Sequence, residues 1–263
     1  MNLDLQGKNA LVCGGSKGIG KAIALELAIL GANVTLCSRS EDILQSAALE
    51  LDTSNGNTHD YFTADFSKPD LLKNALNNYL AKTGKAFNIL INNTGGPAGG
   101  PIVNAETSEF LSAFNNHLIC NHILATTLIP AFKETGYGRI VNIISTSVKV
   151  PLNGLGVSNT IRGAVASWSK TLANELGQFG ITVNNVLPGA TNTDRLKSII
   201  ENKAAKTNKE QAEVSKAMQG VIPMARFGEP NEIANVAAFL CSPAAAYVSG
   251  QSIAVDGGRT PSL

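Results

Sequence analysis

Short apolar runs alternate with longer stretches of mixed apolar and polar residues along most of this chain. Apolar runs of this kind, bounded by turn residues, are typical of strands that are buried on both faces of a sheet. They occupy residues 10–13, 33–37, 60–63, 88–92, 139–144, 182–186 and 252–255. The segments between them are long enough for crossover helices. The pattern therefore predicts an α/β fold with a doubly wound parallel sheet of about seven strands.

Several of the intervening segments carry helix signals. The sequence Ser67-Lys68-Pro69-Asp70 predicts a helix start with Ser67 as its N-cap and a proline in the first turn. Apolar residues recur at helical spacing in two places, and each set forms a stripe on one face of a predicted helix. Such stripes pack either in the core of the chain or in an interface between subunits. The two stripes are Phe110, Phe114 and Leu118, and Ala164, Trp168, Leu172 and Leu176.

Two stretches interrupt this alternation. Residues 95–101 read GGPAGGP after the fourth predicted strand, which excludes both a helix and a central strand. Residues 194–219 are rich in Lys and Glu, have helical propensity and follow the sixth predicted strand. Because open α/β sheets bind ligands at the carboxyl ends of their strands, we interpret 194–219 as a lid-like insertion; a merely solvated helical excursion is the alternative. No linker or repeat divides residues 1–263, which predicts one domain.

The composition narrows the classes of partner. The chain has 263 residues, of which 44% are hydrophobic and 16% charged, with a formal net charge of +1. Nucleic-acid binding needs a large basic excess, so no nucleic-acid partner is expected. No apolar run approaches the ~18 residues of a membrane span, and residues 1–7 lack a signal-peptide pattern. The scattered cysteines predict reduced thiols, a cytoplasmic location and no metal site; they are Cys13, Cys37, Cys120 and Cys241.

The most informative motif is CGGSKGIG at residues 13–20, between the first predicted strand and the following helix. A glycine-rich turn at this junction seats the pyrophosphate of a dinucleotide on the N-terminus of the helix. Gly14 allows the sharp turn, Gly18 lets the backbone approach the phosphates, and Gly20 lets helix and strand pack closely. The spacing is GxxxGxG rather than the generic GxGxxG. The residues assigned to the cofactor here are Gly14, Ser16, Lys17, Gly18, Ile19 and Gly20.

Together the motifs resemble the short-chain dehydrogenase/reductase family, and within it the members similar to 3-oxoacyl-carrier-protein reductase. The resemblance covers nearly the whole chain. After the glycine turn it is carried by LINNTG at 90–95, GRIVNIIS at 138–145, GITVNNVLPG at 180–189, RFGEPNEIA at 226–234 and the segment 249–258. It implies a single Rossmann-type domain and a nicotinamide cofactor. With the two helix stripes, it also implies a homo-oligomer, either a tetramer or a dimer.

The choice of cofactor depends on the end of the second predicted strand. This strand ends in Ser38-Arg39, and no acidic residue follows until Glu41. A carboxylate here would bind the ribose hydroxyls of NAD, whereas the 2′-phosphate of NADP needs cations. Arg39 and Lys17 therefore favour NADP(H) over NAD(H), unless both are ordinary surface charges. The resemblance implies further cofactor contacts, to adenine by Asp65, to the cofactor groove by Asn93 and Gly95, and to the nicotinamide by Pro188, Gly189, Thr191 and Thr193.

The catalytic set departs from the pattern of the family, which uses an Asn, a Ser, and a Tyr-x-x-x-Lys pair. Ser145 matches the Ser of the family. The positions of the Tyr and the Lys hold Ser158 and Arg162, so that the motif is Ser-x-x-x-Arg. His117 stands at the position of the Asn. No nearby tyrosine restores the pattern.

These replacements change the chemistry that is available. Reduction of a ketone by hydride leaves an alkoxide, which needs a positioned proton donor. A serine hydroxyl is a far weaker acid than a Tyr phenol beside Lys. Ser145 and Ser158 can nevertheless donate hydrogen bonds to an oxyanion, and Arg162 can bind ribose hydroxyls without losing its proton. His117 is a candidate to titrate near neutral pH and to pass a proton through water, although a histidine on a helix of a sheet protein is more often a packed, hydrogen-bonded residue.

The leading hypothesis is an NADP(H)-dependent oxidoreductase that interconverts a carbonyl and an alcohol on a small-molecule or acyl-thioester substrate. This hypothesis follows from the complete set of predicted cofactor-binding motifs and from the presence of Ser145. The alternative is a catalytically silent NADP-binding sensor or scaffold, which follows from the loss of both Tyr and Lys. A dehydration or an isomerisation in the same pocket is a third hypothesis.

Overall fold

The computed structural model describes residues 1–262 as a single α/β domain. Its parallel strands form one seven-stranded sheet in the order β3-β2-β1-β4-β5-β6-β7. The predicted sheet is confirmed, and the largest difference in bounds is at β6, which continues to Pro188. The strands are β1 Asn9–Cys13, β2 Asn33–Ser38, β3 Asp60–Thr63, β4 Ile89–Asn92, β5 Gly138–Ile143, β6 Ile181–Pro188 and β7 Ser252–Val255.

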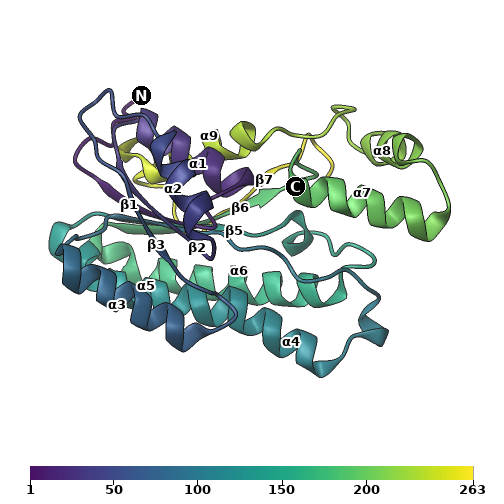
Figure 1. The fold of residues 1–263 in the computed structure, drawn as a ribbon, viewed down its shortest axis with the longest axis horizontal. Helices are drawn as coiled ribbons and strands as arrows, with labels where there is room; N and C mark the ends of the chain where they lie inside the picture. The colour runs from purple at the N-terminus through teal and green to yellow at the C-terminus, as the bar shows by residue number, and fades with distance from the viewer. Residues whose placement is uncertain (263) are drawn as a thin grey trace.

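Helices cover both faces of this sheet (Figure 1). One layer contains α1 (Gly18–Ile29), α2 (Glu41–Leu49) and α9 (Pro230–Cys241). The opposite layer contains α3 (Pro69–Thr83), α4 (Thr107–Phe114), α5 (Cys120–Thr135) and α6 (Gly156–Leu176). Short 3-10 segments lie at Ile102–Asn104, Thr146–Val148, Gly177–Phe179 and Pro243–Ala245.

The strands alternate between two apolar cores. In β1, Ala10 and Val12 pack into the core under α1 and α9, whereas Leu11 and Cys13 pack into the core under α3 and α5. Both faces of a parallel sheet are buried in this way, which is why its strands are continuous apolar runs. Cys13 and the other three cysteines are buried free thiols.

The start of α3 differs from its prediction. The N-cap is Lys68, whose side chain makes no capping hydrogen bond, and Pro69 is the first helical residue. The Ser67 hydroxyl instead donates to Asp65 Oδ1 at 2.8 Å. The assignment of Ser67 as N-cap was therefore wrong, because the loop carboxylate attracts its hydroxyl away from the helix.

The predicted insertion is helical and projects from the carboxyl edge of the sheet (Figure 1). It consists of α7 (Asp194–Thr207) and α8 (Gln211–Gln219). Leu196 of α7 packs with Ile222 and Phe227 in a small apolar cluster of its own. The insertion therefore packs against the segment that follows it, and its function as a lid stays a prediction.

The two helix stripes are only partly buried. Trp168 and Leu172 pack at the margin of the core, and Phe114 remains 37% exposed. The most deeply buried residues of α6 include Val165 and Ser169. The homo-oligomer stays a prediction. Within residues 1–262, no helix has the length and apolarity that crossing a membrane requires, and no cluster of three or more metal-ligating side chains occurs.

Candidate active site

The glycine turn joins β1 to α1 in a conformation that side chains would obstruct. Gly14 has a φ of +58°, and a Cβ there would lie 2.6 Å from the carbonyl oxygen of Asn93. A Cβ on Gly20 would lie 2.1 Å from the carbonyl oxygen of Gly14. The Lys17 side chain makes no capping hydrogen bond at the start of α1. The first N–H groups of this helix are therefore oriented to bind an anion.

A cleft at the carboxyl ends of β1, β2 and β4 brings much of the predicted cofactor set together. Its walls contain the predicted residues Gly14, Ser16, Lys17, Arg39, Asp65, Asn93 and Gly95. Gly18, Ile19 and Gly20 form the first turn of α1 beside it. Sequence reasoning missed several other lining residues, which are Ser38, Ser40, Ile43, Phe66, Ser67, Thr94 and Asn116.

The donor groups in this cleft fit a phosphate. Lys17 and Arg39 both line it, and the Ser38 hydroxyl at the end of β2 is buried with no hydrogen-bond partner among residues 1–262. The carboxylate of the cleft, Asp65, accepts hydrogen bonds from the Ser67 backbone and hydroxyl at 2.9 and 2.8 Å. These bonds, and then the charge of Arg39, lower the pKa of Asp65. The cations and the hydroxyl of this cleft therefore fit the 2′-phosphate that distinguishes NADP from NAD.

The loop before the insertion forms another part of the same site. A Cβ on Gly18 would lie 3.3 Å from Thr193 Cγ2, so the loop reaches the glycine turn. Thr193 Oγ1 caps α7 by accepting from the Leu196 N–H at 3.4 Å. Thr191 Oγ1 donates to the Gly189 carbonyl at 3.1 Å. Pro188 ends β6, so all four predicted nicotinamide residues lie on this one connection.

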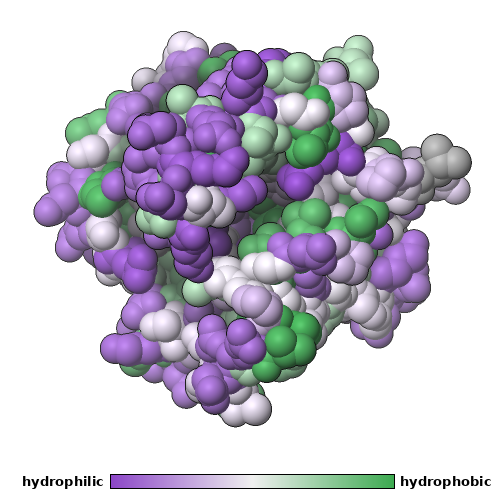
Figure 2. Space-filling model, turned by 90° about the vertical axis from the view of Figure 1, so that its right-hand side faces the viewer, coloured by the Kyte–Doolittle hydropathy of each residue, from purple (hydrophilic) through white to green (hydrophobic). Residues whose placement is uncertain are grey.

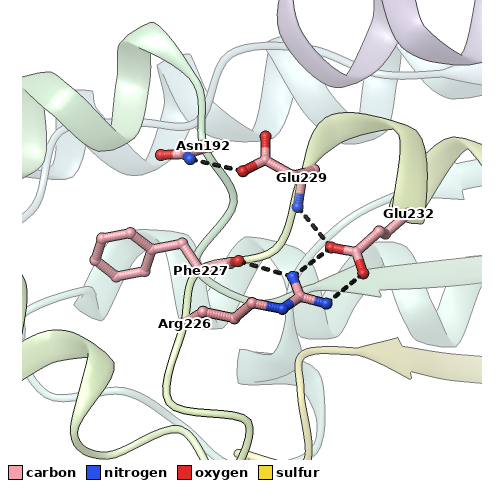
Figure 3. A network of polar contacts seen from close by, with 5 residues as sticks. All are labelled: Asn192, Arg226, Phe227, Glu229 and Glu232. Atoms are coloured by element: carbon pink, nitrogen blue, oxygen red, sulfur yellow. Dashed lines mark hydrogen bonds and ion pairs between the residues drawn. The ribbon is translucent and has the colours of Figure 1, made fainter.

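A polar network fixes that connection from outside (Figure 3). Arg226 donates from both Nη atoms to the Glu232 carboxylate, at 2.7 and 2.6 Å. The Asn192 amide donates to Glu229 Oε1 at 2.8 Å. The backbone adds a bond from the Asn192 N–H to the Gly228 carbonyl at 2.8 Å. The segment 226–232 thereby positions the loop that carries Thr191 and Thr193.

Two of the predicted catalytic residues, Ser158 and Arg162, lie one turn apart on α6. Ser158 is in the first turn of that helix, and Arg162 is 7% exposed. Arg162 Nη1 donates to the Ile143 carbonyl at 3.3 Å, which places the guanidinium at the end of β5. Burial, and then the charge of Arg195, lowers the pKa of Arg162 to about 10, so it stays protonated at neutral pH.

Ser145 follows the same end of β5. Its hydroxyl oxygen accepts a hydrogen bond from the Ser147 N–H at 3.1 Å, which leaves the hydroxyl hydrogen to serve as a donor. Because Arg162 contacts Ile143, two residues before Ser145, the helix and the strand end converge here. The structure thus brings Ser145 and Arg162 to one strand end, and Ser158 precedes Arg162 by one helical turn.

The environment of His117 differs from the one that a catalytic role would need. His117 lies in a π-helical segment, Asn115–Ile119, between α4 and α5, and is 1% exposed. Its Nδ1 lies 2.6 Å from Thr94 Oγ1. Burial, with the charges of Arg162 and Arg195, lowers the pKa of His117 to about 3. The expectation that His117 titrates near neutral pH is therefore wrong, because its ring is enclosed beside two cations; the packed, hydrogen-bonded alternative describes it.

Two residues that sequence reasoning overlooked stand out at the site. Asn116 lines the cofactor cleft and an adjoining pocket, and its buried Oδ1 lacks a hydrogen-bond partner in the described chain. Arg195, in the first turn of α7, donates to the Pro97 carbonyl at 2.8 Å. The only sequence signal for Arg195 was its place at the start of the insertion. Figure 2 looks onto the side that carries α7 and α8, and shows a hollow beneath their mostly hydrophilic surface.

Comparisons with known proteins agree with this geometry. Residues 14–260 match the family described as enoyl-(acyl carrier protein) reductase. The chain is 33% identical to the 3-oxoacyl-[acyl-carrier-protein] reductase FabG of Pseudomonas aeruginosa, over 97% of this chain and 98% of the relative. It is 32% identical to the 7alpha-hydroxysteroid dehydrogenase of Escherichia coli K12, over 100% and 98%.

A solved structure is similar over its full length. L-sorbose reductase from Gluconobacter frateurii, complexed with NADPH and L-sorbose, superimposes with a TM-score of 0.93 at 29% identity, and the match covers 100% of both chains. The sheet order, the glycine turn and these matches agree. The chain therefore belongs to the short-chain dehydrogenase/reductase family, in the part of it described by the enoyl-(acyl carrier protein) reductase family model.

Proposed function

We propose that this protein is an NADP(H)-dependent oxidoreductase that interconverts a carbonyl and an alcohol on a small or acyl-chain substrate, with an altered catalytic set. The observation that carries the proposal is the proximity of the cofactor cleft to Arg162. Lys17, Ser38 and Arg39 line this cleft together with Gly95. Arg162 lies beside the next residue, since its Nη2 is 3.6 Å from a Cβ built on Gly96, and it also bonds the Ile143 carbonyl at the strand end that precedes Ser145. The family membership and the NADPH named in the L-sorbose reductase structure support it.

The cofactor supplies or accepts a hydride when it is bound. The first turn of α1 binds its pyrophosphate, and Lys17, Ser38 and Arg39 bind its 2′-phosphate. Asp65 contacts the adenine, Asn93, Gly95 and Asn116 line the groove, and Arg162 binds the nicotinamide ribose. The connection that contains Pro188, Gly189, Thr191 and Thr193 would hold the nicotinamide amide.

The substrate oxygen is bound by hydroxyl groups rather than by a phenol. Ser145 and Ser158 donate hydrogen bonds to it, and the buried positive charge of Arg162 stabilises negative charge that develops there. Neither serine gives up its proton, because a serine hydroxyl is too weak an acid. Solvent water delivers the proton. His117 stays neutral and positions Thr94 at the wall of the cleft.

A nucleotide titration tests the cofactor assignment. Purified protein titrated with NADPH and NADH by fluorescence is expected to bind NADPH more tightly. Arg39→Ala should remove that preference by weakening NADPH about tenfold or more while leaving NADH unchanged. Lys73→Ala, an exposed change on α3, is the control. An unchanged NADPH preference in Arg39→Ala contradicts the phosphate assignment.

Turnover separates the two main hypotheses. A panel of β-keto thioesters and simple ketones is expected to give NADPH oxidation with at least one member. Tight NADPH binding without turnover across the panel would instead favour the silent sensor or scaffold, for which the missing Tyr and Lys are the motivating observation. Absence of nucleotide binding would overturn both.

A further inference from the structure

Two arginines from different elements meet at the loop that follows β4. A Cβ built on Gly96 would lie 3.3 Å from Arg195 Nη2 and 3.6 Å from Arg162 Nη2. Arg195 reaches this position from α7, and its Nη2 also donates to the Pro97 carbonyl at 2.8 Å. Arg162 reaches it from α6. The two guanidinium groups therefore flank the same short stretch of backbone.

No acidic side chain pairs with either arginine in the described chain. The nearby carboxylates are used elsewhere, because Asp194 pairs with Lys197 and Glu109 accepts from the Glu106 N–H at 2.8 Å. The ion pairs found among residues 1–262 are Lys21–Glu50, Lys197–Asp194, Lys209–Glu213 and Arg226–Glu232. The pair of arginines thus concentrates positive charge at the site without compensation from the protein.

Placing two positive charges together costs free energy, and this cost is larger for Arg162, which is buried, than for Arg195, which is exposed. The side chain of Arg162 is 7% exposed, and its buried Nε has no hydrogen-bond partner within residues 1–262. A buried charge beside a like charge is unfavourable unless an opposite charge compensates both. A guanidinium matches the planar, two-oxygen geometry of a carboxylate. The buried charge of Arg162 and the second cation beside it both indicate an anionic ligand that the chain itself does not provide.

We propose that Arg162 and Arg195 bind a carboxylate of the substrate, which makes the substrate a keto acid or the corresponding hydroxy acid. This inference rests on the proposed function. Arg162 lies one helical turn from Ser158, so a carboxylate on its guanidinium lies close to the oxygen that Ser158 contacts. One donor of Arg162 bonds the Ile143 carbonyl, and the remaining donors are enough for both this carboxylate and the ribose hydroxyls. Arg195 is then the residue that selects acids over neutral carbonyl compounds.

Binding of an unreactive keto-acid mimic tests the carboxylate site directly. Oxamate carries a carboxylate beside a carbonyl that is not reduced, and its affinity for the NADPH complex is measured by calorimetry. Arg195→Gln is expected to weaken oxamate about tenfold or more, because it removes a charged hydrogen-bond donor. Lys197→Gln is the matched control, since Lys197 is the next cation on α7 and pairs with Asp194. It is expected to change oxamate affinity less than about twofold.

Kinetics with matched substrates give a second readout. Wild-type protein is expected to turn over 2-oxo acids with a higher kcat/KM than their methyl esters. Arg195→Gln should raise KM for the acids and leave the esters unchanged. An equal loss for acid and ester overturns the proposal. So does a matching loss of NADPH affinity in Arg195→Gln, which would assign Arg195 to the cofactor phosphates.

The failure of the proposed function is distinguishable from failure of this site. If wild-type protein binds no nucleotide, the proposed function is overturned. Oxamate titration of the nucleotide-free protein then decides the carboxylate site alone. Equal oxamate affinity in wild type and Arg195→Gln overturns it, and a selective loss in Arg195→Gln supports it.

Discussion

Thr94 Oγ1 and His117 Nδ1 lie 2.6 Å apart, and this contact joins the loop after β4 to the π-helical segment between α4 and α5. A π-helical turn inside a longer helix is frequent at functional sites. Here it contains a histidine that is 1% exposed, and that histidine is uncharged at neutral pH.

The first prediction concerns the pH dependence of stability. Burial lowers the pKa of His117 from 6.5 to about 3, so between these values the unfolded state binds a proton that the folded state does not. The contribution to stability is therefore complete above pH 6.5 and is lost as the pH falls toward 3. At pH 4 the loss is roughly 3 kcal/mol. Denaturant unfolding at pH 7 and pH 4 measures it.

The controls for this prediction are two glutamine variants. His117→Gln should show a smaller loss of stability between pH 7 and pH 4 than wild type, because it removes the group that titrates. His122→Gln, at an exposed position on α5, should behave like wild type. The same pH dependence in His117→Gln and wild type would contradict the assignment of a buried neutral histidine.

The second prediction concerns the glycine turn. Gly20→Ala places a Cβ 2.1 Å from the Gly14 carbonyl oxygen, a backbone atom that cannot move without displacing the turn. We expect a destabilisation of about 3 kcal/mol or more and a loss of NADPH binding. Gly163→Ala on α6 is the control, because no atom lies within 4 Å of its Cβ. It should be neutral or stabilising by up to about 1 kcal/mol. Nucleotide binding by Gly20→Ala at wild-type affinity would refute the tight approach of α1.

The third prediction concerns the hydroxyl donors. Ser145→Ala removes one donor to the substrate oxygen, and kcat is expected to fall about 10²-fold with NADPH affinity unchanged. Ser167→Ala, at an exposed position on α6, should retain full activity. A change in KM or in NADPH affinity alone would place Ser145 outside the reacting region.

The fourth prediction concerns a variant that introduces the Tyr-x-x-x-Lys pair implied by the family resemblance. The double variant with Ser158→Tyr and Arg162→Lys is expected to lose the native activity, because it removes the Ser158 hydroxyl and the Arg162 guanidinium that the proposed site uses. Steady-state kinetics on the substrate found in the panel measure this. Gain of a reductase activity that wild type lacks would instead show that the natural chain is a silent module.

The fifth prediction concerns the network in Figure 3. Hydrogen bonds from Arg226 lower the pKa of Glu232 to about 2, so this ion pair persists throughout the physiological pH range. Arg226→Gln is expected to reduce kcat/KM severalfold with little change in Tm, because the pair is exposed and acts by positioning the loop at 190–193. Hydrogen exchange of that loop should accelerate. Glu213→Gln on α8 breaks the exposed pair with Lys209 and should leave the exchange of the loop unchanged.

The sheet could be predicted from the sequence because its strands are buried on both faces. An apolar run such as residues 88–92 can be buried on both sides as a strand of a parallel sheet that helices cover on both faces. The nucleotide turn was predictable for a similar reason, since Gly14 and Gly20 stand where backbone crowding excludes a side chain. Local chemistry therefore determined both features.

The rest of the candidate site depends on contacts between distant segments. The hydrogen bond from Arg195 to the Pro97 carbonyl joins residues 98 positions apart, and no local pattern in the sequence predicts it. The pKa of His117 depends on burial and on the charges of Arg162 and Arg195. Asn116 became a candidate only because a π-helical turn brings it to the cleft. Ser67 failed as a cap because Asp65 competes for its hydroxyl.

The alternation in β1 has an effect on how this protein tolerates change. Ala10 and Val12 face one core, Leu11 and Cys13 face the other, and Gly14 follows directly. A one-residue insertion within β1 exchanges the side chains of the two cores and also displaces the start of the nucleotide turn. A change in the length of this strand therefore disturbs the packing of both cores and the nucleotide turn at the same time.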